Sequence, residues 1–449
     1  MPSRRPSPRP VRLVWDRREA PASPPAVLHL LSDTSASLDA PLTGDIYHGD
    51  NLPVMSALLP QLDGRIDLIY ADPPFNTGRA YTTRIGRSED SRRPGTWKKT
   101  AGYDDRWDDP AAYLDMLGPR LEAMYRLLAP SGTLYLHVDW RASAHAKVLL
   151  DEIFGRDRLL NEIIWIYHGP SPIKSAFKRK HDTLLVYTKS SRYTFNADAV
   201  RVPYDDATRK AFASSPRAGF GKVPDLARGK VPEDWWYFPV VARLHGERTG
   251  YPTQKPMALM ERIVLASSKK GDLVADFFGG SGTTAVAAAR YSRRWILCDQ
   301  SPIAVETAYR RLLLEDPGLR CRIWLAQPAR ASGSLARRLR WSQSGRTLRI
   351  SLLTTSLRGR RSGAAAEVNL WEVDWEAGEE FRSRSQAIRP WRSDQLPRTL
   401  RHVYDGPGTY LVRVRAWDAL GRMHAAHRRV SISSERGNPK RKRARVGAP

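Results

Sequence analysis

The chain has 449 residues, 41% of them hydrophobic, which is enough for two or three domains with a sizeable core. Lys and Arg number 73 against 47 Asp and Glu, a formal net charge of +26. This charge favours a polyanionic partner, nucleic acid first and an anionic membrane surface second, with a merely soluble basic protein as the alternative. The 14 Trp, 17 Tyr and 10 Phe exclude disorder of the whole chain.

The cysteine content and the lengths of the apolar runs narrow the cellular setting. Cys298 and Cys321 are too few for a disulfide framework or a cysteine-rich zinc site, and they fit a reducing compartment. No apolar run approaches the roughly 18 residues of a membrane helix. The stretch Val27–Leu31 is too short for a secretory signal. We therefore expect a cytoplasmic protein with no membrane partner and no metal site.

Residues 1–40 are rich in Pro, Arg, Ser and Ala without sustained periodicity, which predicts a disordered basic arm. From about Gly44 onward, short apolar runs alternate with segments of helical spacing. The predicted strands are Ile46–His48, Ile66–Tyr70, Thr133–Val138, Glu162–Tyr167, Asp182–Thr188, Leu273–Asp276 and Trp295–Asp299. The predicted helices are Pro110–Leu128, Ala144–Phe154, Met257–Ser267, Thr283–Arg290 and Pro302–Leu314. This alternation indicates an α/β domain with a mostly parallel sheet over residues 41–317.

Other segments depart from this rhythm. Residues 189–250 are basic and irregular, which predicts an insertion in the α/β domain. Residues 318–366 contain many Arg and no acidic residue, and are predicted to be a linker or the start of a second domain. Residues 367–434 show period-two alternation around the turn at 405–408, which predicts a small β-sandwich. Residues 435–449 are predicted to be a basic tail.

The segment Leu273–Thr284 joins an apolar strand, the acid Asp276 and a glycine-rich turn that opens a helix. Glycines there let a ligand approach the backbone, and the helix N-terminus offers free N–H groups. Asp299 ends the next predicted strand, where a carboxylate can accept both hydroxyls of a ribose. Taken alone, the pattern also fits a nicotinamide cofactor or a structural tight turn.

The second motif, Asp72-Pro73-Pro74-Phe75, directly follows a predicted apolar strand. Two consecutive prolines fix the backbone and leave carbonyls without N–H groups of their own to compete. A carboxylate, a rigid carbonyl and an aromatic face can then address a planar heterocycle that carries an amine. The alternative interpretation is a proline turn at the end of a strand.

Together these motifs resemble the amino-group DNA methyltransferases that use S-adenosyl-L-methionine. The motif order, catalytic before cofactor, is similar to the beta arrangement that type III modification subunits also have. The matching stretches are Gly49–Leu52, Asp72–Gly78, His181-Asp182, Thr253–Pro256 and Asp276–Thr284. The family commonly has Ala where this chain has Gly279. The resemblance implies a Rossmann-like methyltransferase sheet with helices on both faces, in a prokaryotic or phage protein associated with the nucleoid.

The resemblance also implies roles for individual residues. Asp72 would orient the target amine, with Pro73 and Pro74 in the same catalytic motif, and Phe75 would stack on the base. Phe277, Gly280 and Gly282 would surround the methionine end of the cofactor near Asp276, and Asp299 would hold the ribose. Lys255 and Pro256 would help to close the cofactor pocket. Asp50 would contact the adenosine, or would instead cap a helix N-terminus.

The predicted reaction moves a methyl group to N6 of an adenine flipped out of double-stranded DNA. Methylation at cytosine carbon 5 is excluded, because in that family the nucleophilic cysteine follows Pro, whereas Leu297 precedes Cys298 and Arg320 precedes Cys321. Cytosine N4 remains the alternative base; an RNA or a protein amide is an alternative substrate. A DNA-binding protein with an inactive methyltransferase core is the alternative without enzymatic activity.

Two basic segments are expected to contact DNA: residues 189–250, as the target-recognition region, and the loop Arg79–Arg106. Trp235-Trp236 would stack on a base or anchor the core. The C-terminal β-domain resembles the immunoglobulin-like appendage of some of these enzymes and would serve either DNA affinity or assembly. Without helicase or nuclease motifs in this chain, any restriction subunit would be a separate chain; a homodimer is also compatible with the sequence.

Overall fold

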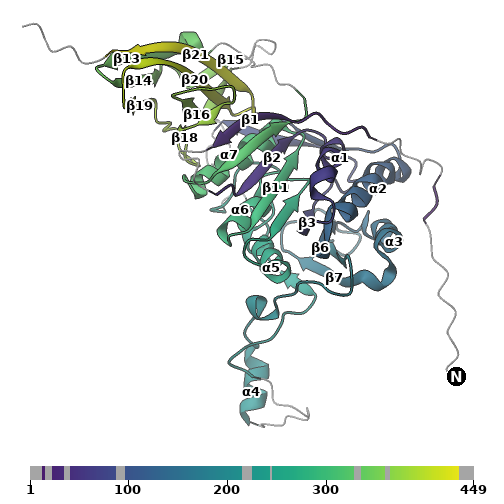
Figure 1. Cartoon of the computed structure of the whole chain (residues 1–449). Helices are drawn as coiled ribbons and strands as arrows, with labels where there is room; N and C mark the ends of the chain where they lie inside the picture. Colours follow the sequence, from purple (N-terminus) through teal and green to yellow (C-terminus); the bar gives the residue numbers. More distant parts are fainter. Residues whose placement is uncertain are drawn as a thin grey trace, which may run out of the picture.

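The structure is a computed structural model that describes residues 13–15, 23–34, 41–86, 97–214, 225–242, 245–327, 335–358 and 365–433. Its main feature is an 11-stranded sheet with the order β17-β1-β12-β2-β11-β10-β3-β6-β8-β7-β9 (Figure 1). The strands are β1 (His29–Thr34), β2 (Gly44–His48), β3 (Ile66–Ala71), β6 (Leu128–Val138), β7 (Leu159–Ile166), β8 (His181–Thr188), β9 (Trp235–Tyr237), β10 (Leu273–Asp276), β11 (Arg294–Asp299), β12 (Cys321–Leu325) and β17 (Arg382–Ser383). The six strands from β12 to β6 run parallel, and β8 and β1 pair antiparallel on either side of them. The predicted mostly parallel α/β sheet is confirmed.

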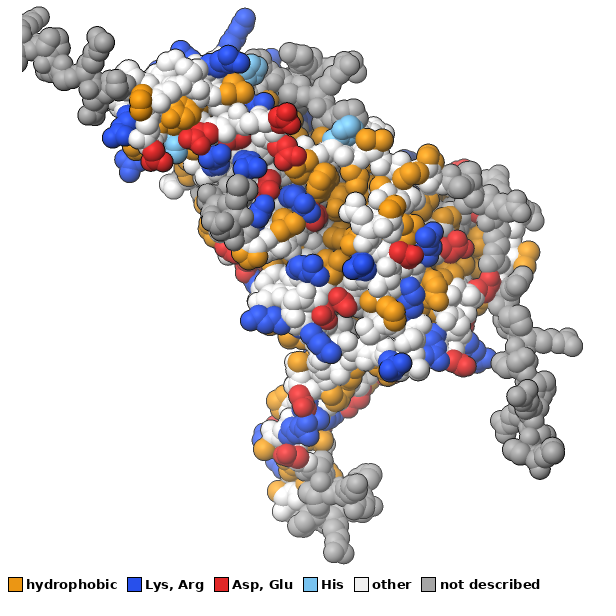
Figure 2. Space-filling view, viewed as in Figure 1, with side chains coloured by type: hydrophobic (Ala, Val, Ile, Leu, Met, Phe, Trp, Pro, Cys, Tyr) orange, Lys and Arg blue, Asp and Glu red, His pale blue; other side chains and the backbone are white. Residues whose placement is uncertain are grey.

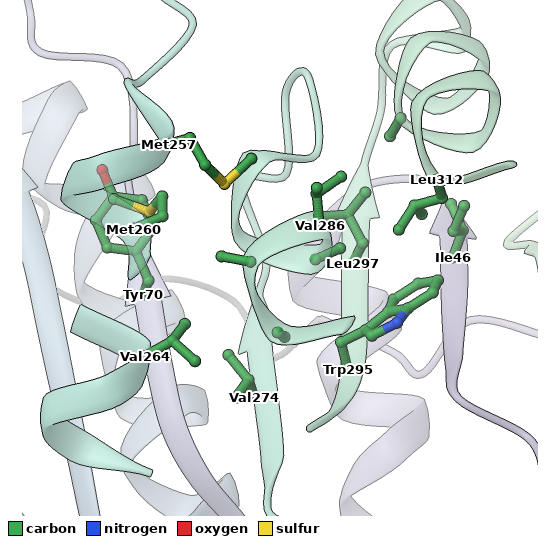
Figure 3. Close-up of a cluster of buried hydrophobic side chains, with 14 of the residues drawn as sticks. Ile46, Tyr70, Met257, Met260, Val264, Val274, Val286, Trp295, Leu297 and Leu312 are labelled. Carbon is green, nitrogen blue, oxygen red and sulfur yellow. The ribbon is translucent and has the colours of Figure 1, made fainter. Parts of the chain in front are cut away.

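Helices cover both faces of this sheet, as predicted. Neighbouring strand residues point to opposite faces: Leu68 packs with α5 (Met257–Ser267), α6 (Thr283–Arg290) and α7 (Pro302–Glu315), whereas Ile69 packs with α1 (Asn51–Leu62), α2 (Pro110–Leu127) and α3 (Ser143–Phe154). Figure 3 shows the first of these layers, where Val286 and Leu312 lie close to Trp295. Because both faces are buried, the strands are continuous apolar runs.

The predicted disordered arm is wrong for residues 29–34, which form β1 and pair with β12. The strand has no alternating apolar pattern, because three of its buried residues are polar: Ser32, Asp33 and Thr34. The Thr34 hydroxyl donates to the carbonyl of Cys321 over 2.7 Å. Most other residues of the predicted arm, and the predicted basic tail, lie outside the described residues.

The predicted loop after the Asp-Pro-Pro motif is in large part a β-hairpin of β4 (Arg79–Gly86) and β5 (Trp97–Asp105). The predicted insertion 189–250 contains the short helix η3 (Ala197–Val200), the helix α4 (Asp206–Ser214) and the edge strand β9. Figure 1 shows α4 at the end of an arm that projects away from the sheet. Between β6 and β9, the helix η2 (Arg156–Arg158) leads into β7.

The predicted boundary at residue 317 is too early, because β12 belongs to the large sheet. The C-terminal domain then begins with η4 (Ala336–Arg338), so this part of residues 318–366 is the start of the second domain, one of the two predicted alternatives. One of its sheets has β13 (Leu339–Ser344), β14 (Thr347–Leu352) and β19 (Thr399–Val403); the other has β15 (Ser356–Arg358), β16 (Ala365–Asp374), β18 (Ser385–Ile388), β20 (Gly408–Asp418) and β21 (Met423–Ile432). Ile350 of the first sheet and Val373 and Val414 of the second share one buried core. The immunoglobulin-like assignment stays a prediction.

The C-terminal domain packs against α7 through buried polar groups. Glu372, which is fully buried, accepts hydrogen bonds from the Tyr309 hydroxyl over 2.9 Å and from Trp417 Nε1 over 3.2 Å. The Arg310 guanidinium donates to the carbonyl of Arg389 over 2.9 Å. The two domains therefore meet in an interior rather than across an exposed linker. In the described part of the chain, no helix is long and apolar enough to cross a membrane.

Candidate active site

The ends of β3 and β10 place the two predicted motifs side by side. Asp276 pairs with Tyr70 in the register of these parallel strands, so Asp72 and the glycine turn emerge at the same edge of the sheet. This is the switch point where α/β sheets bind ligands. A cavity of about 940 Å³ lies there. Ten of the predicted site residues line it: Asp50, Asp72, Pro73, Pro74, Phe75, Lys255, Asp276, Phe277, Gly280 and Asp299.

Gly282 and Pro256 lie behind the cavity wall. Gly282 precedes α6 with φ of 76°, and a Cβ there would lie 2.7 Å from the Ala308 Cβ of α7. Pro256 occupies the N-cap position of α5. Both residues thus shape the helices next to the cavity rather than its surface.

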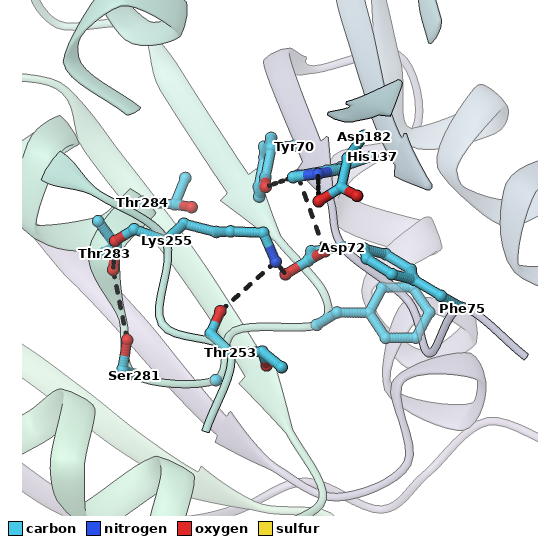
Figure 4. A network of polar contacts seen from close by, with 12 residues as sticks. Tyr70, Asp72, Phe75, His137, Asp182, Thr253, Lys255, Ser281, Thr283 and Thr284 are labelled. Atoms are coloured by element: carbon cyan, nitrogen blue, oxygen red, sulfur yellow. Dashed lines mark hydrogen bonds and ion pairs between the residues drawn. The ribbon is translucent and has the colours of Figure 1, made fainter. Parts of the chain in front are cut away.

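Asp72 has one engaged carboxylate oxygen and one that is not engaged. Its Oδ2 forms an ion pair with Lys255 Nζ, as drawn in Figure 4. Its Oδ1 is buried without a hydrogen-bond partner among the described residues, and His137 Nδ1 lies 3.8 Å away. The Lys255 ammonium also lies 5.3 Å from the centre of the Phe75 ring. A buried acceptor that lacks a hydrogen bond beside an aromatic face suits an incoming amine.

The turn that carries Phe75 is held by Asp105, which the sequence analysis did not identify. This carboxylate accepts hydrogen bonds from the backbone N–H groups of Phe75, Asn76 and Thr77 over 3.2, 2.8 and 3.0 Å. Asn76 has a positive φ of 59°, so the turn needs such support. Asp105 ends β5, and its distance along the chain from the motif conceals this contact from sequence reasoning.

A buried polar chain behind Asp72 was also missed. The Tyr70 hydroxyl and His137 Nδ1 are 2.7 Å apart, and His137 Nε2 lies 3.4 Å from Asp182 Oδ2 (Figure 4). The Tyr167 hydroxyl donates to Asp182 Oδ1 over 3.1 Å. Burial acts to raise the pKa of Asp182, but the hydrogen bond and charge of His137 leave that pKa below its usual value. The sequence analysis included His181-Asp182 among the matching stretches, and the structure shows that Asp182 of this stretch contacts His137 and Tyr167.

At the glycine turn, two carboxyls line the cavity, the buried Asp276 and the partly buried Asp299. Asp299 accepts hydrogen bonds from the backbone N–H groups of Gly280 and Ser301, each over 2.8 Å. Asp276 accepts from the Thr284 hydroxyl over 2.7 Å. Burial raises the pKa of Asp299 to about 6 and that of Asp276 to about 7. Perturbed acids in a cavity are typical of functional sites.

Gly279, where the family commonly has Ala, has a local explanation. A Cβ at this position would lie 2.5 Å from the side chain of Leu297 in the neighbouring strand. The Leu297 side chain therefore fills the space that the methyl group of an alanine at position 279 would need.

Asp50 serves as a helix cap and also lines the cavity. Its Oδ1 accepts from Leu52 N over 3.0 Å at the start of α1 and from Arg120 over 2.7 Å. The helix-cap alternative is confirmed. Arg120 and Asn51 line the same wall and were not predicted. Asn51 Nδ2 donates to the carbonyl of Phe277, directly after β10, over 2.7 Å. Such contacts between α1, α2 and the end of β10 join residues that are far apart in the chain.

The segment before α5 closes one side of the cavity. Gln254 accepts from Thr249 N over 2.8 Å and donates to the carbonyl of Glu247 over 2.7 Å, which fixes the loop that carries Lys255. Tyr251, buried against Gly280, lines the cavity and was not predicted.

The other sequence predictions meet mixed outcomes. Trp236 is buried and anchors the core, as one alternative predicted, whereas Trp235 is 57% exposed and its stacking on a base stays a prediction. Cys298 and Cys321 are buried, and burial raises the pKa of the Cys298 thiol well above its usual value, which does not suit a nucleophile. Within the described ranges, no cluster of three or more His, Cys, Asp or Glu could hold a metal ion.

The fold and this site define an α/β protein with a cavity at the switch point of its sheet, lined by the Asp72 carboxylate, the Phe75 ring and a glycine-rich turn. Residues 66–310 match the sequence profile of the N6/N4 DNA methylase family. The chain belongs to this family and is an amino-group DNA methyltransferase, so S-adenosylmethionine as cofactor and DNA as substrate, both predicted, are confirmed at the level of the family.

Two relatives illustrate the match. The chain is 30% identical over 251 residues to the type II methyltransferase M.HpaI of Haemophilus parainfluenzae, covering 56% of this chain and 69% of that protein. It is 27% identical over 346 residues to the type II methyltransferase M.EcaI of Enterobacter cloacae, covering 64% of this chain and 73% of the relative.

Two solved structures resemble parts of the chain. The M1.HpyAVI–SAM complex has a TM-score of 0.40 and 20% identity, covering 60% of this chain and 98% of that one. The cytosine-N4-specific PvuII DNA methyltransferase has a TM-score of 0.42 and 20% identity, and the match covers 62% of this chain and 87% of that one.

Proposed function

We propose that this protein methylates the N6 amine of an adenine that is flipped out of double-stranded DNA at a specific site. The observation that carries the proposal is Asp72 Oδ1, a buried acceptor without a hydrogen-bond partner among the described residues, on the same cavity wall as the Phe75 ring. Adenine and cytosine both carry an amine that fits this acceptor. Asp as the first residue of the Pro-Pro motif favours adenine, because Ser goes more often with cytosine in this family.

In the proposed complex, the target ring stacks on Phe75 and its amine donates to Asp72 Oδ1 and to the Pro73 carbonyl. Both hydrogen bonds favour a more tetrahedral nitrogen, which frees a lone pair that is otherwise delocalised into the ring. The Lys255 ammonium forms an ion pair with Asp72 Oδ2, which fixes the orientation of the carboxylate so that Oδ1 faces the incoming amine. The rigid Pro73-Pro74 backbone fixes these groups in advance, so positioning supplies much of the acceleration.

The residues around the glycine turn fit S-adenosylmethionine, which when bound supplies an electrophilic methyl group. Asp299 lines the cavity at the end of β11, where it would accept the ribose hydroxyls. Gly280, with φ of 51°, turns its backbone towards the cavity, and Phe277 with Asp276 forms the wall next to Asp72. Asp50 lies on the same wall, where it would contact the adenosine.

The proposal is tested by incubating the purified protein with unmethylated DNA and S-adenosylmethionine, followed by digestion and mass spectrometry of the nucleosides. N6-methyladenine supports the proposal, and sequencing then maps the site. N4-methylcytosine would replace the base and keep the mechanism. Absence of any methylated nucleoside, with cofactor binding intact, would redirect the assignment to an RNA or a protein substrate.

Asp72→Ala should reduce methyl transfer by at least about 100-fold while DNA binding is retained, because it removes the acceptor and not the protein–DNA surface. Asp72→Asn keeps the shape and removes the charge. The matched control is Asp63→Ala, an exposed acid at the end of α1 and thus at the opposite edge of β3. Turnover that survives in Asp72→Ala would show that the proposed mechanism is wrong.

A further inference from the structure

The loop between β7 and β8, together with His181 as the first residue of β8, spans residues 167–181 and begins and ends at the wall of the cavity. Tyr167 and Asp182 both line it, and Tyr167 N donates to the carbonyl of Lys180 over 3.1 Å, which closes the base of the loop. Whatever binds with a base in the cavity therefore passes next to this loop.

The loop carries a large apolar side chain that is not packed against the described part of the protein. Phe177 is 100% exposed, the most exposed of the large hydrophobic residues that the structure describes. Lys174, Lys178 and Arg179 are also exposed, and no Asp or Glu occurs from residue 168 to residue 181. An exposed aromatic ring surrounded by cations, with no acid nearby in the chain, fits a partner that has negative charges on its surface and an apolar interior that the ring can enter.

The loop is held in place at the mouth of the cavity by stacking. The Arg179 guanidinium lies 4.3 Å from the centre of the Trp140 ring, and that of Arg141 lies 4.7 Å from it. Asp139 and Arg141, on either side of Trp140 in the chain, line the cavity. At the base of the loop, His168 contacts the Tyr237 ring of β9, with 5.1 Å between the ring centres.

Charge alone does not locate the DNA-binding face. Figure 2 shows basic side chains spread over the face in view and interspersed with acidic ones. The loop 167–181 differs in that its cations, its exposed ring and the cavity mouth coincide.

We propose that this loop engages duplex DNA beside the flipped base, with Phe177 inserted into the base stack and Lys174 and Lys178 on the phosphates. This inference rests on the proposed function, because a base that leaves the duplex for the cavity leaves a gap in the stack next to the cavity mouth. Apolar side chains inserted between base steps stabilise unstacked DNA. Phe177 is a positioning residue: it touches neither the cofactor nor the reacting amine.

The test compares a matched duplex that contains the mapped site with the same duplex mismatched at the target base, under single-turnover conditions. Phe177→Ala should slow methylation of the matched duplex by about tenfold or more and slow the mismatched duplex far less, because flipping costs least from a mismatch. Phe177→Leu should keep most of the rate. Val403→Ala, which shortens an exposed apolar side chain of β19, is the matched control and should equal the wild type.

Each other outcome overturns the proposal. Equal loss on both duplexes would show that Phe177 supports the active site rather than the flipped state. No loss on either would show that it does not enter DNA, and would leave an acidic protein partner for the loop. An inactive wild-type enzyme would overturn the proposed function together with this inference, whereas an active wild type with an unimpaired Phe177→Ala overturns this inference alone.

The phosphate contact has an independent readout. Lys178→Ala should reduce the slope of log affinity against log salt by about one, as expected for one lost phosphate contact. Lys270→Ala removes an exposed lysine just before β10, at the edge of the sheet opposite the cavity, and should leave the slope unchanged. Equal slopes for Lys178→Ala and the wild type would contradict the placement of the loop on DNA.

Discussion

Asp299 is a carboxyl group that lies inside the protein and yet should bind its ligand as an anion. Burial raises its pKa to about 6, from an ordinary value of 3.8. Because the ionised form is the better acceptor of ribose hydroxyls, affinity for S-adenosylmethionine should fall as the pH drops through about 6, approaching tenfold per pH unit below it. Calorimetric titration between about pH 5 and pH 8 measures this dependence.

The stability of the free protein should change in the opposite sense. A carboxyl whose folded pKa is raised keeps its full contribution below about pH 4 and loses it as the pH rises through about 6. The variant Asp299→Asn tests the binding prediction. It should bind the cofactor weakly, and its affinity should depend less on pH, while Asp276, with its pKa of about 7, still titrates in the variant. An unchanged pH profile in Asp299→Asn would assign the effect to Asp276 instead.

Single residues were predictable from the sequence where a motif keeps them together, as in Asp72 and Phe75 or Gly280 and Asp276. They were not predictable where the fold brings together residues that are far apart in the chain. Asp105 supports the Phe75 turn from 30 residues away, and His137 lies between Tyr70 and Asp182 in the sheet. Such contacts depend on strand order, which hydrophobic periodicity does not encode.

The turn between β10 and α6 shows how one element fixes the distance to another. Gly282 has φ of 76°, and a Cβ there would meet the Cβ of Ala308 in α7. Gly282→Ala should therefore combine backbone strain of about 1–2 kcal/mol with overpacking of about 1–3 kcal/mol. Urea unfolding measures the loss, and cofactor affinity should fall as well, because α6 starts at the cavity.

The matched control is Gly64→Ala. Gly64 has a similar φ of 68°, but a Cβ there would have no atom within 4 Å. This variant should show the strain alone, about 1–2 kcal/mol. Equal losses in the two variants would contradict the close packing of α6 on α7.

Elements were predictable where burial on both faces makes apolar runs: β3 and β10 match their predicted ranges to within one residue, whereas β6 begins at Leu128, five residues before its predicted start. The strands β12 and β1, which lie in that order beyond β2 in the sheet, were not predicted. β1 buries polar side chains, so it has no apolar alternation, and β12 lies in an Arg-rich stretch that suggested a linker. Both strands have a neighbour on each side, and β1 is also held by side-chain hydrogen bonds such as that of Thr34 to Cys321, which leave a weaker trace in composition than apolar burial does.

At the scale of the whole molecule, the buried junction at α7 should make the two domains unfold together. Glu372 accepts from Tyr309 of the methyltransferase domain and from Trp417 of its own domain, and all three side chains are buried. Glu372→Ala leaves both donors without this acceptor, which should cost about 1–3 kcal/mol for each. In urea, the wild type should show one transition, whereas the variant should unfold earlier or in two steps.

Glu380→Ala, an exposed acid of the same domain, is the control and should behave as the wild type. Because α7 begins just after Asp299, loosening this junction should also weaken cofactor binding, and a Glu372→Ala variant with wild-type stability would show that the C-terminal domain is a separate appendage.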